Sequence, residues 1–189
     1  ESQGGICDRC GSEVVQKEKE QWMLKITAYS QKLLDGLDEV DYLPRIKMEQ
    51  RNWIGRSEGA EMNFPLSVEG KSLKIFTTRP DTIYGATFMV IAPEHPIVEE
   101  IQDSITNMDQ VREYQDFAAK KSEFERKLPS KEKTGVQLEG VYAVNPVSGQ
   151  KLPVYMSDYV LISYGTGAIM CVPAHDERDW AFAQKFGIP

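Results

Sequence analysis

The sequence predicts an α+β fold in which short strands form a closed or nearly closed β-barrel with helices at its periphery. Short apolar or alternating segments recur between residues 60 and 172, and turn-forming glycine, proline or asparagine residues separate several of them. Fewer stretches have apolar residues three or four positions apart, which is the spacing of an amphipathic helix. Many short strands with only a few helices are typical of a sheet that closes on itself.

The bulk composition sets the class of protein. The 189 residues suffice for one core and a small appendage, and with 41% hydrophobic and 27% charged residues the composition is that of an ordinary globular protein. No apolar run reaches membrane-spanning length, so we expect a cytoplasmic protein without a membrane partner. A net charge of −7 argues against a surface that coats nucleic acid, but it permits a site for one end of an RNA. The basic span from Lys120 to Lys133 is interpreted as a solvated helix face and loop.

Near the start of the chain, Cys7 and Cys10 form a Cys-x-x-Cys-Gly knuckle, a spacing at which two thiolates can bind the same zinc ion. A tetrahedral site needs four ligands, and the one remaining cysteine, Cys171, lies in a predicted buried strand. We therefore expect half of a zinc site, with its other half upstream, and little or no bound metal. The chain does not begin with a signal peptide, and the absence of an initiator methionine likewise predicts a piece of a longer chain.

A helix and a β-hairpin are the next predicted elements. Residues 19–40 carry apolar side chains at helical spacing and predict one helix. Residues 61–68 and 71–78 predict two strands, and Gly70 lies in the turn that joins them.

Two threonines end the second strand of this hairpin. Because side chains alternate along a strand, Thr77 and Thr78 are expected to point to opposite faces. Only one of them can then face a cleft, unless the strand twists or bulges at its end. Pro80 forces a turn that Asp81 can cap.

The middle of the chain is predicted to contain helices and further strands. Residues 86–92 predict a buried strand. Residues 96–105 and 107–127 each predict one helix, the second beginning with a capping-box variant of Asn107 and Gln110. Short strands are expected at residues 141–144, 151–156 and 158–162.

The stretch from residue 163 to residue 186 predicts a turn, a buried strand, a sharp break and a helix. Residues 168–172 are the strand, and Gly187 is predicted to end the helix. Asp176 is the predicted N-cap, and Asp179 lies three residues on, so both carboxylates lie where the helix dipole favours negative charge. Acidic groups and free backbone N–H groups at a strand end suit a ligand with an ammonium and an ester. From these residues alone, the favoured interpretation is a capped helix whose charges merely face water.

Other chemistries find little support. No Ser-His-Asp or Cys-His set is evident, and His95 precedes a helix-starting proline and is expected to be structural. A metal site of His175, Asp176 and Asp179 lacks the usual His-x-x-x-His partner. The Gly165-Thr166-Gly167 run lacks the Gly-Lys-Ser/Thr ending of a P-loop.

Two motifs remain, Thr-Thr-Arg-Pro-Asp-Thr at residues 77–82 and Gly-Thr-Gly-Ala-Ile-Met-Cys-Val-Pro-Ala-His-Asp-Glu-Arg-Asp at residues 165–179. Together they resemble the editing insertion of bacterial leucyl-tRNA synthetases, and residues 50–59 resemble the segment that leads into that insertion. The resemblance covers nearly the whole chain, and two long motifs in the right order make it specific. The first motif alone is less specific, because isoleucyl and valyl enzymes carry a similar run.

The resemblance implies a β-barrel-like editing domain of the leucyl, isoleucyl and valyl type that hydrolyses the ester of mischarged tRNA(Leu). Such an ester is already activated, so hydrolysis needs a positioned water, a place for the oxyanion and a firm hold on the substrate. The implied partners are the 3′ end of tRNA(Leu) with its non-cognate aminoacyl group and the rest of the synthetase. Editing implies no cofactor, whereas leucine ligation by the parent enzyme implies ATP and Mg²⁺. Many relatives also carry a small zinc module before the insertion.

The same resemblance implies roles for individual residues. Asp179 is expected to bind the α-ammonium of the amino acid, with a charge-assisted hydrogen bond of about 1.5–3 kcal/mol, and Asp176 to orient neighbours or cap the helix. Thr77 and Thr78 are expected to contact the ester and the attacking water. Thr82 would exclude the branched γ-carbon of leucine, because its own β-branch is stiff. The other implied substrate-binding residues are Arg79, Asp81, Tyr164, Met170, Val172 and His175, and a purely structural ion pair of Arg79 with Asp81 is an equal alternative.

We expect residues 1–57 to be a remnant of the synthetic domain, with the half zinc knuckle, a helix and a linker. Residues 58–189 would be the editing domain, truncated at its C-terminal end. One alternative is a valyl or isoleucyl editing domain, against which Met170 and the run at 175–179 argue. Others are a non-catalytic zinc-knuckle binding module, which predicts stoichiometric zinc and no deacylation, and a folded but inactive piece.

Overall fold

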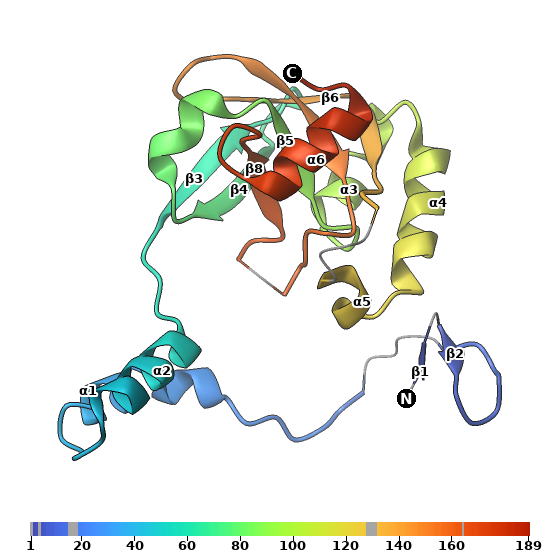
Figure 1. The fold of residues 1–189 in the computed structure, drawn as a ribbon. Coiled ribbons are helices and arrows are strands. Elements are labelled where there is room, and N and C mark those ends of the chain that lie inside the picture. Colours follow the sequence, from blue (N-terminus) through green and yellow to red (C-terminus); the bar gives the residue numbers. More distant parts are fainter. Residues whose placement is uncertain (1, 4, 15–18, 128–131, 164) are drawn as a thin grey trace. The chain divides into compact units, whose positions relative to one another are not determined.

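The computed structural model describes residues 2–3, 5–14, 19–127, 132–163 and 165–189 (Figure 1). Its chain divides into two compact units, one of residues 17–58 and one of residues 1–16 and 59–189. In the described part of the chain, no helix has the length and apolar character needed to span a bilayer. The assignment of residues 1–57 to a synthetic domain stays a prediction.

The smaller unit contains three short helices. They are η1 (Ile26–Tyr29), α1 (Ser30–Gly36) and α2 (Pro44–Ile54). The single helix predicted over residues 19–40 is wrong, since residues 19–25 have no regular structure. No described residue covers Trp22, which is fully exposed, so the apolar stripe lacks the packing that stabilises a helix of this kind. Helix α2 was not predicted, although Gly55 ends it in the left-handed conformation, with φ of 63°.

The N-terminal residues form a small hairpin of β1 (Ser2–Gln3) and β2 (Ile6–Cys7). The Gly11 N–H donates to the Cys7 carbonyl at 2.9 Å, which brings the two cysteines into one turn. Cys10 is exposed, with its Sγ 2.9 Å from the Ser12 hydroxyl. Within the described residues, no group of three or more His, Cys, Asp or Glu side chains could hold a metal ion. Two thiols do not complete a four-ligand zinc site. Little bound zinc stays a prediction, which elemental analysis can test.

Residues 59–189 contain a hairpin and a four-stranded sheet. The strands are β3 (Ala60–Pro65), β4 (Ser72–Thr77), β5 (Phe88–Ile91), β6 (Val136–Val144), β7 (Lys151–Met156) and β8 (Ala168–Cys171). Strands β3 and β4 pair antiparallel, as predicted. The sheet has the order β6-β7-β5-β8, in which β5 and β7 run parallel and the other neighbours antiparallel.

The predicted α+β class is confirmed, but the strands of the described residues do not pair into a closed barrel. The hairpin lies beside both edges of the sheet, with β3 next to β6 and β4 next to β8. On the β6 side, Leu66 forms a bridge with Ala143, and the Ser67 N–H donates to the Tyr142 carbonyl at 2.8 Å. On the other side, no backbone hydrogen bond among the described residues joins β4 to β8. We call this junction the β4–β8 seam, and side chains rather than a ladder occupy it.

The core lies on both faces of the four-stranded sheet, so β5 is buried throughout. Met89 and Ile91 belong to the cluster shared with the hairpin. Phe88 and Val90 belong to the cluster shared with helix α6 (Glu177–Phe186), which crosses the other face of the sheet (Figure 1). There the ring of Phe182 stacks on Phe88 with centroids 5.3 Å apart. This packing fixes the start of α6 against the end of β8.

Two predicted helices are interrupted in the structure. The observed elements are α3 (Ile97–Glu100), the 3-10 turn η3 (Gln102–Ser104), α4 (Met108–Ala119) and α5 (Glu123–Lys127). Ser122 and Glu125 start α5 as a capping box: the Ser122 N–H donates to Glu125 Oε2 at 2.8 Å, and the Glu125 N–H donates to Ser122 Oγ at 3.3 Å. The capping box predicted at Asn107 and Gln110 is wrong, because the Asn107 side chain accepts no backbone N–H of the helix. It bonds the backbone of Gln137 and Glu139 in β6 and donates to Gln110 Oε1 at 3.1 Å.

The segment 158–162 forms a turn, and the strand predicted there is wrong. Buried Arg126 is the physical reason: its Nε donates to the Asp158 carbonyl at 2.8 Å and its Nη2 to the Val160 carbonyl at 2.7 Å. A side chain thus takes the bonds that a neighbouring strand would make. The basic span around it is therefore not simply a solvated face. We call Arg126 with these two carbonyls the Arg126 clamp.

Candidate functional site

A pocket of about 220 Å³ lies where the end of β4, the turn η2 (Pro80–Gly85), β8 and the start of α6 meet. Every predicted site residue except Asp81 and Tyr164 lines it, and Tyr164 is outside the described residues. The motifs at residues 77–82 and 165–179 therefore meet in space, with Thr82 and Asp179 in one cavity. We call this cavity the threonine pocket. Its lining residues are Phe76, Thr77, Thr78, Arg79, Thr82, Ile169, Met170, Val172, His175, Asp176, Arg178 and Asp179.

The threonines of the first motif have different hydrogen-bond states. Thr77 Oγ1 accepts the Arg79 N–H at 3.0 Å, and Thr82 Oγ1 donates to the Arg79 carbonyl at 2.9 Å. This second bond and burial hold the β-branched Thr82 side chain in one rotamer. Strand β4 ends at Thr77, so Thr78 lies in a bend and escapes the strict alternation that would turn it away. Its hydroxyl makes no hydrogen bond to a described residue, which leaves it available to a ligand.

Arg79 and Asp81 form a bidentate ion pair with distances of 3.0 and 2.8 Å. This hydrogen-bonded contact raises the pKa of Arg79 and lowers the pKa of Asp81. Both side chains are more than half exposed, so the pair contributes only about 0–1 kcal/mol to stability. Asp81 does not line the threonine pocket, whereas Arg79 does, and the geometry places Asp81 as the partner that orients Arg79.

Asp176 caps helix α6, as predicted. Its Oδ1 accepts the N–H groups of Arg178 at 2.8 Å and of Asp179 at 3.2 Å. Burial pushes the pKa of Asp176 upward, but the hydrogen bond and charge of Arg178 and the two backbone N–H groups outweigh it, so this pKa lies below its ordinary value. Asp176 is therefore an anion already neutralised by its own helix end and by Arg178.

Asp179 differs from Asp176 in being buried and in forming no ion pair with a described residue. Its exposed fraction is 5%, its Oδ2 accepts the Val172 N–H at 2.9 Å, and its Oδ1 accepts the Tyr159 hydroxyl at 3.2 Å. Burial raises the pKa of Asp179 above its ordinary value, the Val172 N–H opposes this rise, and the charge of Asp176 adds to it. Within the described residues, no lysine or arginine forms an ion pair with it. The carboxylate thus lies in the pocket without an ion-pair partner among the described residues, although its charge contributes to the raised pKa of Arg178, which pairs with Asp176.

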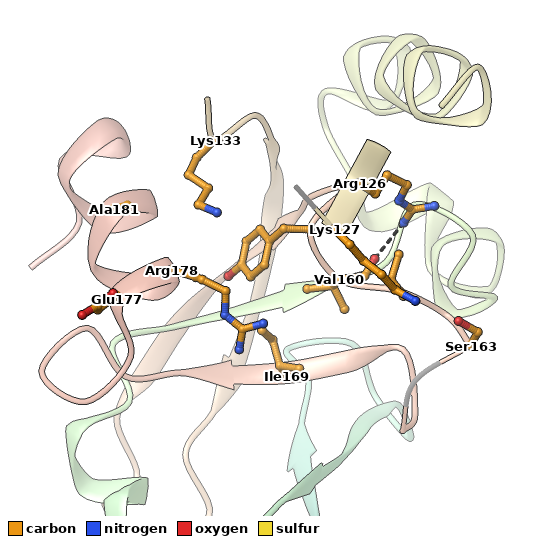
Figure 2. Close-up of a pocket in the computed structure, with 11 residues that line it drawn as sticks. Arg126, Lys127, Lys133, Val160, Ser163, Ile169, Glu177, Arg178 and Ala181 are labelled. Atoms are coloured by element: carbon orange, nitrogen blue, oxygen red, sulfur yellow. Dashed lines mark hydrogen bonds between the residues drawn. The ribbon is translucent and has the colours of Figure 1, made fainter. Parts of the chain in front are cut away.

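Several lining residues were missed by sequence reasoning. Phe76 and Ile169 come from the two strands of the seam. Strand alternation turns each of them away from its neighbour, Thr77 or Met170, so no sequence signal pointed to them. Arg178 lies within the second motif but was given no role. A second cavity of about 650 Å³ shares Ile169 and Arg178 with the threonine pocket (Figure 2). Its other lining residues are Arg126, Lys127, Lys133, Tyr159, Val160, Leu161, Ser163, Glu177 and Ala181.

Comparison with known proteins gives the family. Residues 51–189 match the family model described as "Leucyl-tRNA synthetase, editing domain". The chain belongs to the leucyl-tRNA synthetase editing-domain family. This confirms the leucyl resemblance and goes against the valyl and isoleucyl alternatives.

The relatives of this editing domain are much longer proteins. A leucine–tRNA ligase of Alkaliphilus oremlandii is 57% identical over 185 residues, which are 98% of this chain and 23% of that protein. A leucine–tRNA ligase of Chlorobium limicola is 54% identical over 179 residues, 95% of this chain and 22% of that protein. The crystal structure of a ternary complex, Agrobacterium radiobacter K84 agnB2 LeuRS-tRNA-LeuAMS, matches with a TM-score of 0.75 and 36% identity, covering 98% of this chain and 22% of that chain. The chain thus spans less than a quarter of the length of these curated relatives.

The threonine pocket of this editing domain lacks a strongly activated nucleophile. Its polar groups are hydroxyls, two carboxylates, a histidine and two guanidinium groups. Such a set can orient a water molecule and bind a cationic group, which are the requirements for hydrolysis of an ester that is already activated.

Proposed function

We propose that this domain hydrolyses the ester bond of tRNA(Leu) that carries a non-cognate amino acid, by attack of water. One observation carries the proposal: Asp179, a buried carboxylate without a cation, shares a small cavity with the threonine hydroxyls. An α-ammonium group bound there supplies the missing positive charge. The ester carbon then lies within the same cavity as the hydroxyls of Thr77 and Thr78.

The roles of the side chains follow from their existing bonds. Asp179 binds the ammonium with a charge-assisted hydrogen bond of about 1.5–3 kcal/mol. The Thr78 hydroxyl, which makes no hydrogen bond to a described residue, positions the attacking water or the ester oxygen. The Thr77 hydroxyl accepts the Arg79 N–H and can still donate its own proton to the substrate. Arg79, His175 and Asp176 form the polar wall, and Asp81 orients Arg79. Tyr164 is proposed as a further wall residue on the strength of the family resemblance alone.

Selectivity against leucine is proposed to lie at Thr82. Its side chain is held by the bond to the Arg79 carbonyl, so its methyl group has a fixed place in the pocket that Met170 and Val172 also line. A synthetic site gains only about 1–3 kcal/mol per methylene, so similar amino acids are mischarged and need a second site that sorts by shape.

The wider context of the domain is also a proposal. The whole enzyme ligates leucine to tRNA(Leu) with ATP and Mg²⁺ in the cytoplasm, and the domain acts on the 3′ end of that tRNA. The fold is proposed to be the barrel-like one of the leucyl, isoleucyl and valyl editing domains. Support for this comes from the hairpin, which lies beside both β8 and β6 and so continues the ring of strands.

The test is deacylation of isoleucyl-tRNA(Leu) by the full chain and by Asp179→Asn. Asparagine keeps the shape and can still accept the Val172 N–H, but it has no charge for the ammonium. We expect a loss of about 10- to 150-fold in kcat/KM, the equivalent of about 1.5–3 kcal/mol. Asp116→Asn, the same change on the exposed face of α4, is the matched control and should leave the rate unchanged. Equal rates for the two variants would remove Asp179 from its proposed role.

Alanine is a poorer substitution at this position. Asp179→Ala would leave the Val172 N–H and the Tyr159 hydroxyl without partners. Each donor that water does not reach would then lower the stability by about 1–3 kcal/mol. A loss of activity in that variant would then mix loss of charge with loss of structure. A longer chain that continues past residue 189 should be assayed in parallel, since the relatives extend well beyond the matched part.

A further inference from the structure

Tyr159 contacts Asp179 from outside the threonine pocket. Its hydroxyl donates to Asp179 Oδ1 at 3.2 Å and lies 3.4 Å from the Cys171 Sγ. Its ring packs on Phe182 with centroids 5.7 Å apart, and Lys133 Nζ lies 5.3 Å from the ring centroid. Tyr159 lines the second cavity and is absent from the lining of the threonine pocket. It can therefore act on a substrate in the threonine pocket only through Asp179.

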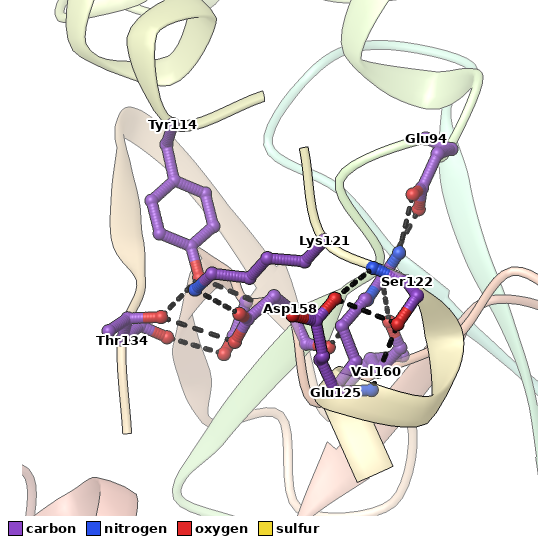
Figure 3. A network of polar contacts seen from close by, with 10 residues as sticks. Glu94, Tyr114, Lys121, Ser122, Glu125, Thr134, Asp158 and Val160 are labelled. Carbon is purple, nitrogen blue, oxygen red and sulfur yellow. Dashed lines mark hydrogen bonds and ion pairs between the residues drawn. The ribbon is translucent and has the colours of Figure 1, made fainter. Parts of the chain in front are cut away.

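The backbone on both sides of Tyr159 is fixed by buried contacts. The Arg126 clamp binds the carbonyls of residues 158 and 160, and the Arg126 guanidinium also pairs with Glu94 at 2.6 Å. Figure 3 shows the contacts of Asp158 beside it: the Asp158 N–H donates to the Tyr114 hydroxyl at 3.1 Å, and Lys121 Nζ lies 2.9 Å from its Oδ2. These contacts restrict the backbone of the turn. The direction of the Tyr159 side chain is therefore set by Tyr114 of α4 and Arg126 of α5.

A carboxylate needs two fixed contacts to hold its plane. Rotation about the last bond of an aspartate side chain is broad and roughly two-fold, so the bond from the Val172 N–H to Oδ2 alone leaves the plane of Asp179 free to turn. The Tyr159 hydroxyl holds the other oxygen. With both oxygens held, the remaining lone pairs of the carboxylate have fixed directions.

We propose that Tyr159 is a positioning residue for Asp179, and that the Arg126 clamp holds Tyr159 in place for this task. The proposal rests on the proposed function, because it assumes that the oriented Asp179 carboxylate binds the amino group of the substrate. Nothing in it requires Tyr159 to touch the substrate. A merely structural tyrosine would pack against Phe182 equally well without its hydroxyl.

The hydroxyl also affects the charge state of Asp179. Burial raises the pKa of this carboxyl, and the bond from Tyr159 opposes the rise by stabilising the anion. Loss of the hydroxyl should therefore move the pKa of Asp179 further upward, and the acid limb of a deacylation profile should move to higher pH with it. The titratable and charged groups around Asp179 are Tyr159, Cys171, Asp176 and Arg178, with Arg79 and His175 across the pocket.

The test compares Tyr159→Phe with Tyr155→Phe in the full chain. Tyr155 belongs to the same aromatic cluster, but its hydroxyl bonds Gln137 at 3.3 Å instead of Asp179, which makes it a matched control. Titration of the Asp179 carboxyl by carbon-13 NMR reports the contact without any need for activity. Deacylation of isoleucyl-tRNA(Leu) as a function of pH reports its effect on the reaction.

We expect Tyr159→Phe to move the carboxyl titration to higher pH and to lower kcat/KM about fivefold near neutral pH, because phenylalanine keeps the ring but removes the hydrogen bond that orients the carboxylate. Tyr155→Phe should change neither. If the two variants behave alike while Asp179→Asn abolishes deacylation, the positioning role is wrong and the proposed function stands. If Tyr159→Phe moves the titration but the unaltered chain and its longer form do not deacylate, the contact is supported and the proposed function falls. A titration that does not move overturns the positioning role in every case.

Discussion

Replacing Arg126 by methionine tests how much the Arg126 clamp contributes to the stability of the domain. The side chain is 4% exposed, and it donates to two buried carbonyls and to Glu94. Methionine has a similar length and no polar group, so it fills much of the space but leaves both carbonyls without their donor. The change therefore isolates the Arg126 clamp from the packing around it.

The expected loss can be worked out from these contacts. A hydrogen bond from a charged donor contributes about 1.5–3 kcal/mol, so the two carbonyls together account for about 3–6 kcal/mol. The pair with Glu94 adds little, because the Glu94 side chain is 38% exposed and such a pair is worth about 0–1 kcal/mol. Apolar contacts of the new side chain offset part of the loss. We expect the free energy of unfolding to fall by about 3–5 kcal/mol, which is most of the loss from the two carbonyl bonds.

Urea denaturation followed by circular dichroism measures this loss. Arg112→Met is the matched control, because Arg112 also forms a two-bonded pair with a glutamate, Glu99, but its side chain is 47% exposed. It should cost about 1 kcal/mol or less. If Arg126→Met lies within 1 kcal/mol of Arg112→Met, the clamp does not stabilise the turn and the reasoning is refuted. Where Arg126→Met stays folded, its Asp179 carboxyl should titrate at higher pH, as in Tyr159→Phe.

Three further predictions concern the pocket and the cysteines. Thr82→Ala should raise the hydrolysis of leucyl-tRNA(Leu) by about 10- to 200-fold, whereas Thr82→Val, which keeps the branch, should still spare it; attack on leucyl-tRNA(Leu) by the valine variant would place the selectivity in the hydroxyl bond instead. Because burial raises the pKa of Asp179 above its ordinary 3.8, the unaltered chain should lose stability relative to Asp179→Asn as pH rises through and just above that value, and a pH-independent difference in urea midpoints would contradict this. Elemental analysis should find little zinc, since Cys7 and Cys10 supply only two of four ligands; one firmly bound ion per chain would revive the zinc-module alternative.

The elements that sequence predicted correctly are those specified by local pattern. Strands β5 and β8 are short apolar runs that were predicted as buried strands, and β5 is buried throughout. Asp176 and Gly187 mark the two ends of α6, the first by its side-chain cap and the second by a φ of 66°. The two motifs were recognised from family resemblance, and the structure brings them to one pocket.

The errors arose where distant residues decide the local conformation. The turn at residues 158–162 has the composition of a strand, but the carbonyls there are taken by Arg126, which lies about thirty residues earlier. The contact of Tyr159 with Asp179 joins residues that no periodicity connects. The break between α4 and α5 is different, because Ser122 and Glu125 have the Ser-x-x-Glu spacing of a capping box and could have been recognised.

The β4–β8 seam has a consequence for motion. Amide groups on the facing edges of these strands have no partner across the seam in the described residues, whereas those of β5 are bonded to β7 and β8 on both sides. Hydrogen–deuterium exchange should therefore be fast along the seam and slow in β5, since opening the seam breaks no ladder. The threonine pocket, which Thr77 and Met170 line from the two strands of the seam, therefore lies at a junction that can open without breaking a backbone hydrogen bond between β4 and β8 of the described residues.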